Sequence, residues 1–459
     1  MSDQARQLFG TDGIRGIAGE FPLTKQSTYL IGRALGHDLV RTTPKPQAVI
    51  GQDTRESSRW IADRVSEGLA AVGVDVRSAG VITTPGVAYL ARSRGMAAGV
   101  VVSASHNPWT DNGIKVFSGD GFKLTDDREL GIEKEIFALL QNPAAADDTA
   151  IRIPGPSLPG EAELRHSYVK SLAGSVSADL SRFSVLVDCA NGAATAEAPE
   201  LFRSLAINAT FIHIQPDGRN INENCGALHP QTLGNTVAKS AGKYDLGVTF
   251  DGDADRALFC DADGRVVNGD GVLLAAARDL KAQGKLKNDT VVATTMSNMG
   301  LEIALKNSGI KMLRANVGDK YVLEEMLKTG ATLGGEQSGH IIFRDTDSTT
   351  GDGLLTALRL LDVIARSGKP LAALVGDLKV FPQKIQNIRV REKVPFQQIP
   401  SVQKSIEKAE TELQGKGRVV VRYSGTEALA RVMVEAESEE EMQQITAAIS
   451  IEIQKALGM

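Results

Sequence analysis

Three aspartates stand at alternate positions in the hexapeptide DGDADR. In an extended chain, alternate residues face the same side, so Asp251, Asp253 and Asp255 can converge on one point. Carboxylates this close repel one another unless a cation lies between them, and hard oxygen ligands suit Mg²⁺ or Ca²⁺. An EF-hand loop begins in the same way, but this chain has Arg256 and Ala262 where that loop needs Gly and Glu. The segment therefore predicts a Mg²⁺ site of another kind, with a solvated acidic turn as the alternative.

A serine follows a second apolar run, in the hexapeptide SASHNP that begins at Ser103. Ser, Asn and Pro are common in turns, so a capped turn is one interpretation. The other is an exposed serine that carries a phosphoryl group, which brings nearly two negative charges and three acceptor oxygens. Ser105 could then complete the coordination of a cation held by the three aspartates. We expect its neighbour His106 to be structural, because adjacent residues in a strand point apart.

Two basic residues are candidates for work on a transferred phosphoryl group. Lys115 lies shortly after Ser105, in DNGIKVF. A desolvated lysine near other cations can act as a general base. Arg15 lies in the Gly-rich segment FGTDGIRG, whose backbone amides could cradle a phosphate. A surface lysine and an ordinary Gly-rich loop are the alternatives, and the segment lacks the spacing of a nucleotide-binding P-loop.

Two further segments have polar groups suited to a sugar and its phosphate. GEQSGH presents Glu336, Ser338 and His340 at alternate positions, and a carboxylate beside a hydroxyl matches the vicinal hydroxyls of a sugar. RYSGTEALAR combines hydroxyls, a glycine amide and two guanidinium groups, which together suit a phosphate. Its polar residues are Arg422, Ser424, Gly425, Thr426 and Arg431. Either segment could instead be a simple turn.

Alternating strands and helices must position these groups. Short β-branched runs alternate with helical patterns, and three of the runs end in SASHNP, DGDADR and GGEQSGH. Ligands of open α/β sheets gather at such strand ends. We therefore predict three similar α/β domains over residues 1–155, 156–257 and 258–368, with a Pro-rich linker at 143–160. A strand, a long helix, two strands and a final helix then predict a smaller α+β domain over 376–459.

Composition narrows the possible partners. The chain has 459 residues and a net charge of −5, which makes it a poor candidate for binding nucleic acid. Its first residues lack a charged head followed by an apolar stretch, so we expect no secretion signal, and no apolar run approaches the ~20 residues of a membrane span. Its cysteines, Cys189, Cys225 and Cys260, are too far apart in sequence to suggest a metal knuckle or a redox pair. We expect a cytoplasmic enzyme with no nucleic-acid or membrane partner.

The four loops, in this order along the whole chain, resemble the motifs of the α-D-phosphohexomutase family. SASHNP resembles its phosphoserine loop, DGDADR its metal loop, GEQSGH its sugar loop and RYSGTEALAR its C-terminal phosphate loop. The resemblance implies three related α/β domains with mixed sheets plus a smaller C-terminal α+β domain, heart-shaped around a central cleft. FGTDGIRG, EQSGH with its Gln337, and VGDKYVLEE are most similar to the bacterial branch of the family that acts on glucosamine phosphates.

This resemblance implies an isomerase that interconverts glucosamine 6-phosphate and glucosamine 1-phosphate, a step toward UDP-N-acetylglucosamine and peptidoglycan precursors. The reaction would proceed through a phosphoserine at Ser105 and a bisphosphorylated sugar. One Mg²⁺ would be held by the three aspartates and the phosphate on Ser105, with Lys115, Arg15 and His340 as further catalytic candidates. The implied substrate-binding residues are Arg256, Lys320, Glu336, Ser338, Arg422, Ser424, Gly425, Thr426 and Arg431. A homodimer is common in the family.

Three positions depart from the family pattern, and three other functions stay open. Ala428 stands where the family usually has proline, Lys320 where arginine is frequent, and Tyr423 where the residue varies. We expect an altered loop stiffness with retained function, and an influence of Lys320 on substrate preference. A phosphomannomutase/phosphoglucomutase would use the same chemistry. An aspartyl-phosphate phosphatase would have no use for SASHNP, and a non-catalytic sugar-phosphate sensor need not keep the full phosphoryl-transfer set.

Overall fold

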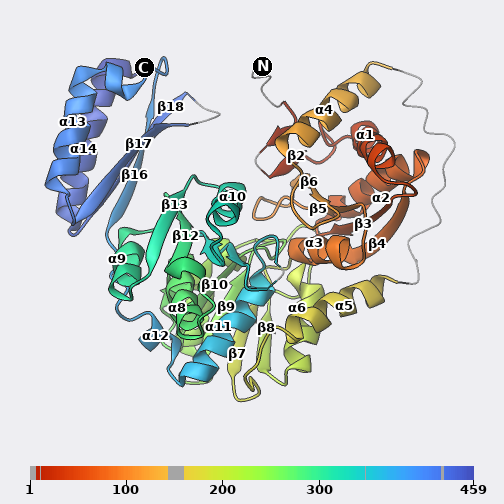
Figure 1. Cartoon of the computed structure of the whole chain (residues 1–459), viewed down its shortest axis with the longest axis horizontal. Coiled ribbons are helices and arrows are strands. Elements are labelled where there is room, and N and C mark those ends of the chain that lie inside the picture. Colours follow the sequence, from red (N-terminus) through yellow and green to blue (C-terminus); the bar gives the residue numbers. More distant parts are fainter. Residues whose placement is uncertain (1–6, 11, 143–159, 347, 425–427) are drawn as a thin grey trace. The chain divides into compact units, whose positions relative to one another are not determined.

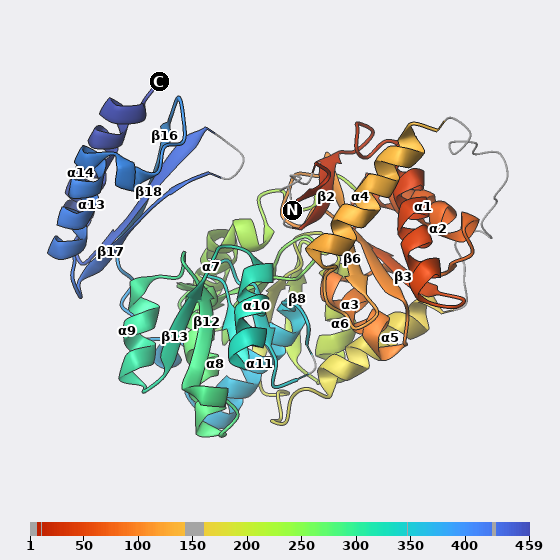
Figure 2. The same cartoon turned by 45° about the horizontal axis from the view of Figure 1, so that its top comes forward.

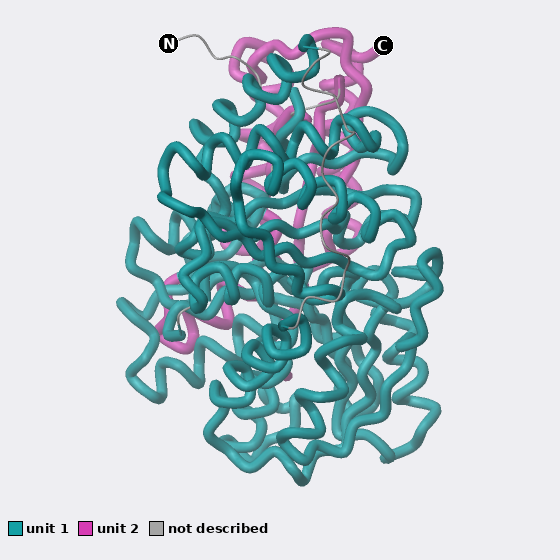
Figure 3. The backbone as a smooth tube through the Cα atoms, turned by 90° about the vertical axis from the view of Figure 1, so that its right-hand side faces the viewer, with its two compact units in different colours: residues 1–295, 312–375 teal, residues 296–311, 376–459 magenta. Residues whose placement is uncertain are grey.

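The computed structural model describes residues 7–10, 12–142, 160–346, 348–424 and 428–459. These residues form two compact units, one of residues 1–295 with 312–375 and one of residues 296–311 with 376–459 (Figure 3). Each unit is described by itself below. None of the helices in the described part of the chain is long and apolar enough to cross a membrane.

The first sheet of the larger unit has the strand order β1-β2-β6-β5-β3-β4. β3 runs parallel to β4 and β5, whereas β5 and β6 are antiparallel, so the sheet is mixed. Its strands are β1 (Phe9–Gly10), β2 (Gly13–Ile17), β3 (Gln47–Gln52), β4 (Asp75–Val81), β5 (Ala98–Val102) and β6 (Asp111–Ser118). The accompanying helices are α1 (Lys25–Thr42), α2 (Glu56–Ala71), α3 (Thr84–Ser93) and α4 (Asp126–Leu140).

Side chains of this sheet alternate between two cores. Ile50 and Val100 pack with α1, α2 and α4, whereas Val49 and Val101 pack with α3 on the other face. Figure 1 shows these helices around the sheet. Helix α3 begins at Thr83, whose side chain accepts the amide hydrogen of Gly86. The polar loops at the ends of β3 and β5 are thus fixed between two packed layers.

The second sheet has the order β11-β10-β9-β7-β8, with β9 and β10 antiparallel. Its strands are β7 (Ser184–Asp188), β8 (Asn208–Ile212), β9 (Leu246–Phe250), β10 (Ala257–Asp261) and β11 (Val266–Val267). Its helices are α5 (Glu161–Ala173), α6 (Ala194–Ser204), the short 3₁₀ helix η2 (Gly226–Leu228) and α7 (Pro230–Lys239). The predicted domain boundary at residue 257 falls inside this sheet, because β9 pairs with β10, and we propose a boundary after β11 instead.

The third sheet has the order β13-β12-β14-β15. Its strands are β12 (Thr290–Thr294), β13 (Lys311–Ala315), β14 (Leu333–Gly335) and β15 (Ile341–Phe343). The neighbouring elements are α8 (Gly269–Ala282), the 3₁₀ helix η3 (Lys287–Asp289), α10 (Asp319–Thr329), α11 (Gly353–Ser367) and α12 (Leu371–Leu374). Asp352 caps α11 by accepting the amide hydrogen of Leu355 at 2.9 Å.

The smaller unit contains an antiparallel sheet with the order β16-β18-β17. Helices α13 and α14 lie side by side on one face of this sheet (Figures 1 and 2). The elements of this unit are α9 (Met299–Asn307), β16 (Gln383–Arg389), η4 (Phe396–Gln398), α13 (Pro400–Glu412), β17 (Gly417–Tyr423), β18 (Leu429–Ala436) and α14 (Glu439–Leu457). The predicted fold class of α/β domains with mixed sheets and a smaller α+β domain is therefore confirmed.

Candidate active site

The three aspartates after β9 lie together. Asp251, Asp253 and Asp255 are buried, and one carboxylate oxygen of each lies within 4.8 Å of those of the other two. The prediction that these residues form an extended segment was wrong. They form a turn in which Ala254 has a φ of 55°, and this turn brings the three carboxylates together. Asp253 Oδ1 and Asp255 Oδ1 are buried and have no hydrogen-bond partner among the described residues. These oxygens are suited to coordinate a hard cation.

Electrostatics supports a cation at this triad. Burial raises the pKa of Asp251 well above its usual range, and the neighbouring Asp255 and Asp253 raise it further. Burial and Asp253 likewise raise the pKa of Asp255. Burial would also raise the pKa of Asp253, but Lys115 and Thr84 outweigh it, so that pKa is lowered overall. A divalent cation would stabilise the charged form of all three carboxylates.

Ser105 lies against this triad. Its hydroxyl donates a hydrogen bond to Asp251 Oδ2 at 2.5 Å. Ser105 has a φ of 51°, in the left-handed region that few non-glycine residues adopt. The metal loop approaches so closely that a Cβ on Gly252 would lie 2.4 Å from the Ser105 carbonyl oxygen. The predicted phosphoserine and metal loops are thus in direct contact.

Two side chains outside the predicted motifs hold the serine loop. The buried Arg55 donates from Nη2 to the carbonyl oxygens of Ser105 at 3.0 Å and Asn107 at 2.6 Å, and it also forms an ion pair with Asp53. Asn222 donates from Nδ2 to the same Ser105 carbonyl at 3.0 Å. A signal was present in the sequence, because GQDTRESS carries Asp and Arg at the end of an apolar strand, where charges need partners.

His106 was expected to point away from Ser105, and this expectation was wrong. Because Ser105 leaves the extended conformation, His106 does not point away from it, and its Nδ1 lies 3.3 Å from Ser105 Oγ. Burial lowers the pKa of His106 to about 4, and Arg256 and Arg15 contribute. The imidazole is therefore neutral near pH 7.

Lys115 lies among carboxylates, and its expected surroundings were also wrong. Its Nζ lies 2.8 Å from Asp253, 2.9 Å from Asp12 and 3.7 Å from Asp255, and its side chain is 2 % exposed. Burial alone would lower the pKa of Lys115, but Asp12, Asp253 and Asp255 raise it well above its usual range. The ammonium form is therefore favoured, because the three carboxylates outweigh burial and Arg15, which would both lower the pKa of Lys115.

A further charged network adjoins Lys115. Asp12 accepts hydrogen bonds from Arg15 Nη2 at 2.5 Å and from Lys123 Nζ at 2.6 Å, and Lys123 also binds Asp319 at 2.5 Å. Burial raises the pKa of Asp12, but the cations Lys115, Lys123 and Arg15 lower it well below its usual range. Asp12 and Asp319 belong to the quoted segments FGTDGIRG and VGDKYVLEE, although the sequence did not single them out.

The sugar loop brings Glu336 and Ser338 together as expected. Ser338 Oγ donates to Glu336 Oε2 at 3.1 Å, and the Gly318 amide donates to Glu336 Oε1 at 3.2 Å. His340 is buried, and its Nε2 accepts the Gly351 amide hydrogen at 3.2 Å. A ring nitrogen that accepts a hydrogen bond carries no hydrogen, so this arrangement leaves Nδ1 as the donor, and Nδ1 has no partner among the described residues.

A cavity of about 430 Å³, the catalytic cavity below, connects several of these groups. It is lined by residues of all three α/β segments, among them Asp12, Arg15, His106, Asp255, Arg256, Asp319, Glu336 and His340. The Arg256 amide donates to Asp251 at 3.2 Å, and its guanidinium lies 3.8 Å from Asp255. Lys320 does not line this cavity and pairs with Asp126. Cations, carboxylates and a neutral imidazole around one cavity suit a phosphorylated sugar.

The predicted phosphate loop lies in the smaller unit. Arg422 and Arg431 are opposite each other on β17 and β18, and Arg431 Nη2 lies 3.4 Å from Ser424 Oγ. Gly425 and Thr426 lie outside the described residues. Tyr423 donates to the Val394 carbonyl oxygen at 2.5 Å, which fixes the end of β17.

A second group of metal-ligand side chains is better explained as structural. Asp188, His213 and Cys225 lie close enough together to hold an ion. Asp188, however, already accepts hydrogen bonds from Ala190 N, His213 Nδ1 and Gly226 N at 2.9–3.0 Å. Burial raises the pKa of Cys225 to about 12, with a contribution from Asp188, so its thiol stays protonated near neutral pH. The group fixes the turns that carry Asn222 and Gly192.

Comparison with family models covers most of the chain. Residues 6–143, 166–264, 268–381 and 386–451 match, in order, domains I, II and III and the C-terminal domain of phosphoglucomutase/phosphomannomutase. A phosphoglucosamine mutase of Koribacter versatilis is 61 % identical over 100 % of this chain and 99 % of its own length. One of Solibacter usitatus is 52 % identical over 99 % of this chain and 100 % of its own length.

Solved structures have the same fold. A phosphoglucomutase/phosphomannomutase family protein of Burkholderia thailandensis superposes with a TM-score of 0.77 at 25 % identity, over 98 % of this chain and 99 % of its own. The N-acetylphosphoglucosamine mutase of Aspergillus fumigatus, solved with GlcNAc-6P and magnesium, gives a TM-score of 0.67 at 19 % identity, over 100 % of this chain and 97 % of its own.

Proposed function

The chain belongs to the phosphoglucomutase/phosphomannomutase family, and on that premise we propose that it is a phosphoglucosamine mutase, an isomerase that interconverts glucosamine 6-phosphate and glucosamine 1-phosphate. The observation that carries the proposal is the contact between Ser105 Oγ and Asp251 beside a buried aspartate triad. The full-length identity to phosphoglucosamine mutases favours glucosamine over other sugars.

In this proposal Ser105 carries the transferred group. The free hydroxyl of the bound sugar phosphate attacks the phosphorus of phospho-Ser105, and the bond between phosphorus and Oγ breaks. The resulting bisphosphate turns within the closed site and returns its other phosphoryl group to Ser105. The three aspartates and the phosphate on Ser105 would hold Mg²⁺, which would neutralise charge on the transferring group.

Lys115 is our candidate for both proton transfers. The sugar hydroxyl loses a proton as it attacks, and Ser105 Oγ gains one as the phosphoryl group leaves. The carboxylates around Lys115 keep it in the ammonium form, so it carries a proton that it can give to Oγ, and it takes the hydroxyl proton in exchange, so its charge is unchanged after the step. Arg15 and Arg256 are proposed to bind phosphoryl oxygens, and His106 and His340 to donate or accept hydrogen bonds nearby.

The remaining residues are proposed to hold the substrate. Glu336 and Ser338 would accept either face of the sugar, and Lys320 would influence sugar preference. The C-terminal loop, with Arg422, Ser424, Gly425, Thr426 and Arg431, would bind the phosphate that does not react. The three cysteines are free, which agrees with the proposed cytoplasmic location. A homodimer stays a prediction.

Mass spectrometry tests the central step. The intact protein and its peptides are measured before and after incubation with Mg²⁺ and glucosamine 1,6-bisphosphate. We expect one phosphate on Ser105 together with isomerisation of glucosamine phosphate, and loss of both in Ser105→Ala with an unchanged fold. Full activity in Ser105→Ala would refute the scheme, and release of free phosphate without isomerisation would favour a phosphatase. Parallel rates on glucosamine, glucose and mannose phosphates test the sugar.

A further inference from the structure

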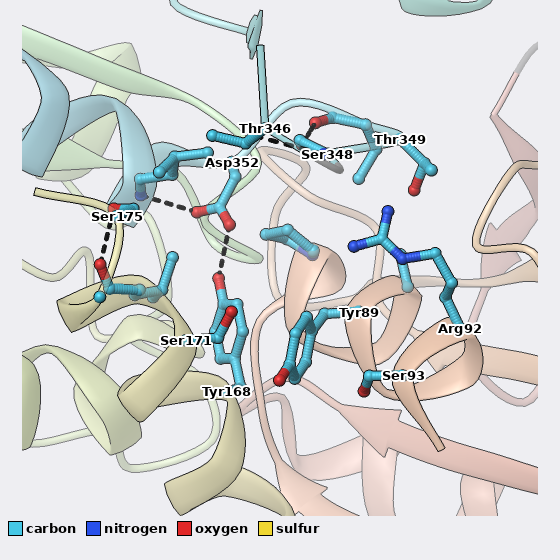
Figure 4. Close-up of a pocket in the computed structure, with 16 residues that line it drawn as sticks. Tyr89, Arg92, Ser93, Tyr168, Ser171, Ser175, Thr346, Ser348, Thr349 and Asp352 are labelled. Atoms are coloured by element: carbon cyan, nitrogen blue, oxygen red, sulfur yellow. Dashed lines mark hydrogen bonds between the residues drawn. The ribbon is translucent and has the colours of Figure 1, made fainter. Parts of the chain in front are cut away.

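A second, larger cavity lies in the same unit. It has a volume of about 610 Å³ and shares no described lining residue with the catalytic cavity. Its walls are one face of α3, the end of α5, Thr346, and residues between Ser348 and Leu355 (Figure 4). We call it the α3 pocket. Its volume is within the range of pockets that bind small molecules.

Arg92 gives the α3 pocket a positive group. It is partly buried on α3, and Figure 4 shows its guanidinium pointing toward the segment that carries Thr349. No hydrogen bond or ion pair joins it to the other described residues. Among the described lining residues, the other charged side chain is that of Asp352, which accepts hydrogen bonds from Tyr168 Oη at 2.9 Å and from the Leu355 amide. Asp352 is held by these hydrogen-bond donors, so the guanidinium of Arg92 is left to bind an anionic ligand with a single charged group.

Hydroxyl groups make up much of the remaining lining. Ser175, Thr346, Ser348 and Thr349 each donate their hydrogen to a backbone carbonyl oxygen, at 2.6–2.8 Å. A hydroxyl that has donated its hydrogen still has lone pairs to accept from a ligand. These side chains therefore complement a ligand that carries several hydroxyl donors.

The wall of the pocket is rigid and aromatic. Tyr168 is buried, donates to Asp352 and has its ring centroid 5.7 Å from that of Tyr89, so the two rings lie together in Figure 4. Thr83 donates to Tyr168 Oη at 3.3 Å, and the next residue, Thr84, donates to Asp253 Oδ2 at 2.5 Å. The same helix therefore lines the α3 pocket and supports the metal loop.

We propose that the α3 pocket is a second binding site, outside the catalytic cavity, for a small polyhydroxylated monophosphate of the sugar-phosphate class. The single unpaired guanidinium would bind the phosphate, the acceptor hydroxyls would bind the sugar hydroxyls, and Tyr89 would pack against the sugar ring. A ligand with two phosphates fits poorly, because the described lining offers no second cation.

The number of bound ligands tests this site. Glucosamine 6-phosphate is the probe, and native mass spectrometry with a titration counts the molecules bound per chain in the wild type, in Arg92→Gln and in the charge-preserving Arg92→Lys. We expect two in the wild type, one in Arg92→Gln and two, with weaker affinity, in Arg92→Lys. Arg94→Gln is the matched control, since Arg94 is an exposed neighbour that pairs with Glu163 and does not line the pocket. It should bind two.

The counts also separate this site from the proposed function. One ligand in the wild type and none in Arg92→Gln would support the α3 pocket while contradicting glucosamine phosphate as the substrate of the catalytic cavity. Equal counts in the wild type and Arg92→Gln would overturn the α3 pocket whatever the catalytic cavity binds. Unchanged unfolding temperatures in all variants show that the counts report binding.

Discussion

Replacing Gly252 by alanine tests whether contact between the serine and metal loops is needed for turnover. The added methyl carbon would lie 2.4 Å from the Ser105 carbonyl oxygen, 2.9 Å from Ile221 Cδ1 and 3.0 Å from Asn222 Nδ2. An ordinary contact needs at least about 3.4 Å, so the two loops must separate by about 1 Å. The oxygen cannot yield cheaply, because Arg55 and Asn222 both donate to it.

A displacement of this size moves Ser105 relative to the carboxylates beside it. Misplacement of reacting groups by about 1 Å can lower a rate by about 10²-fold, and overpacking costs about 1–3 kcal/mol of stability. We therefore expect kcat of Gly252→Ala to fall by about 10²-fold, while the protein stays folded with a modestly lower unfolding temperature. Conversion of glucosamine 6-phosphate followed by ³¹P NMR gives kcat, and thermal unfolding gives the stability.

Gly131→Ala is the matched control. Gly131 is exposed on α4, and nothing lies within 4 Å of an added Cβ. This variant should keep full activity and gain up to about 1 kcal/mol of stability. A kcat of Gly252→Ala within threefold of the wild type would show that the close approach is not required. Complete unfolding of Gly252→Ala would show instead that the estimated cost is wrong.

Three further predictions address the supports of the site. Arg55→Lys should lower kcat at least tenfold with little change in KM, and a wild-type kcat in this variant would contradict the prediction. Arg55→Met should in addition lower the free energy of unfolding by about 3–5 kcal/mol, because Asp53 is left buried without its ion-pair partner. Steady-state kinetics and denaturant unfolding measure the two effects. Burial raises the pKa of Asp352 to about 6, so its stabilising contribution is fully present below about pH 4 and is lost as pH rises through 6. The stability of the wild type minus that of Asp352→Asn should therefore fall by an amount on the order of 3 kcal/mol between pH 4 and 7, and a constant difference would refute the shift. When metal has been removed with a chelator, adding Mg²⁺ at 100 times its Kd should raise the free energy of unfolding by about 2.7 kcal/mol. This effect should vanish in the double variant Asp251→Asn/Asp255→Asn.

Much of the site could be predicted because its residues are neighbours in sequence. Asp251, Asp253 and Asp255 fall within one turn, and Glu336 and Ser338 face each other in another. Their strand-end position follows from the alternation of apolar runs with helices. The partners that come from distant segments could not be predicted in this way. Arg55 follows β3 and reaches the Ser105 carbonyl at the end of the neighbouring strand β5, and no local pattern specifies that contact.

The charged groups around Lys115 also come from distant segments, so the direction of its pKa shift could not be predicted from the sequence. From the sequence, Lys115 was interpreted as a desolvated lysine near other cations, with a surface lysine as the alternative. In the structure, Lys115 pairs in register with Val101 on β5, and its Nζ meets carboxylates from two other loops. A lone buried lysine would lose its proton, but three carboxylates within 3.7 Å reverse the sign of the pKa shift. Tertiary contacts therefore keep Lys115 protonated. Through the same contacts, its positive charge partly neutralises the aspartate triad.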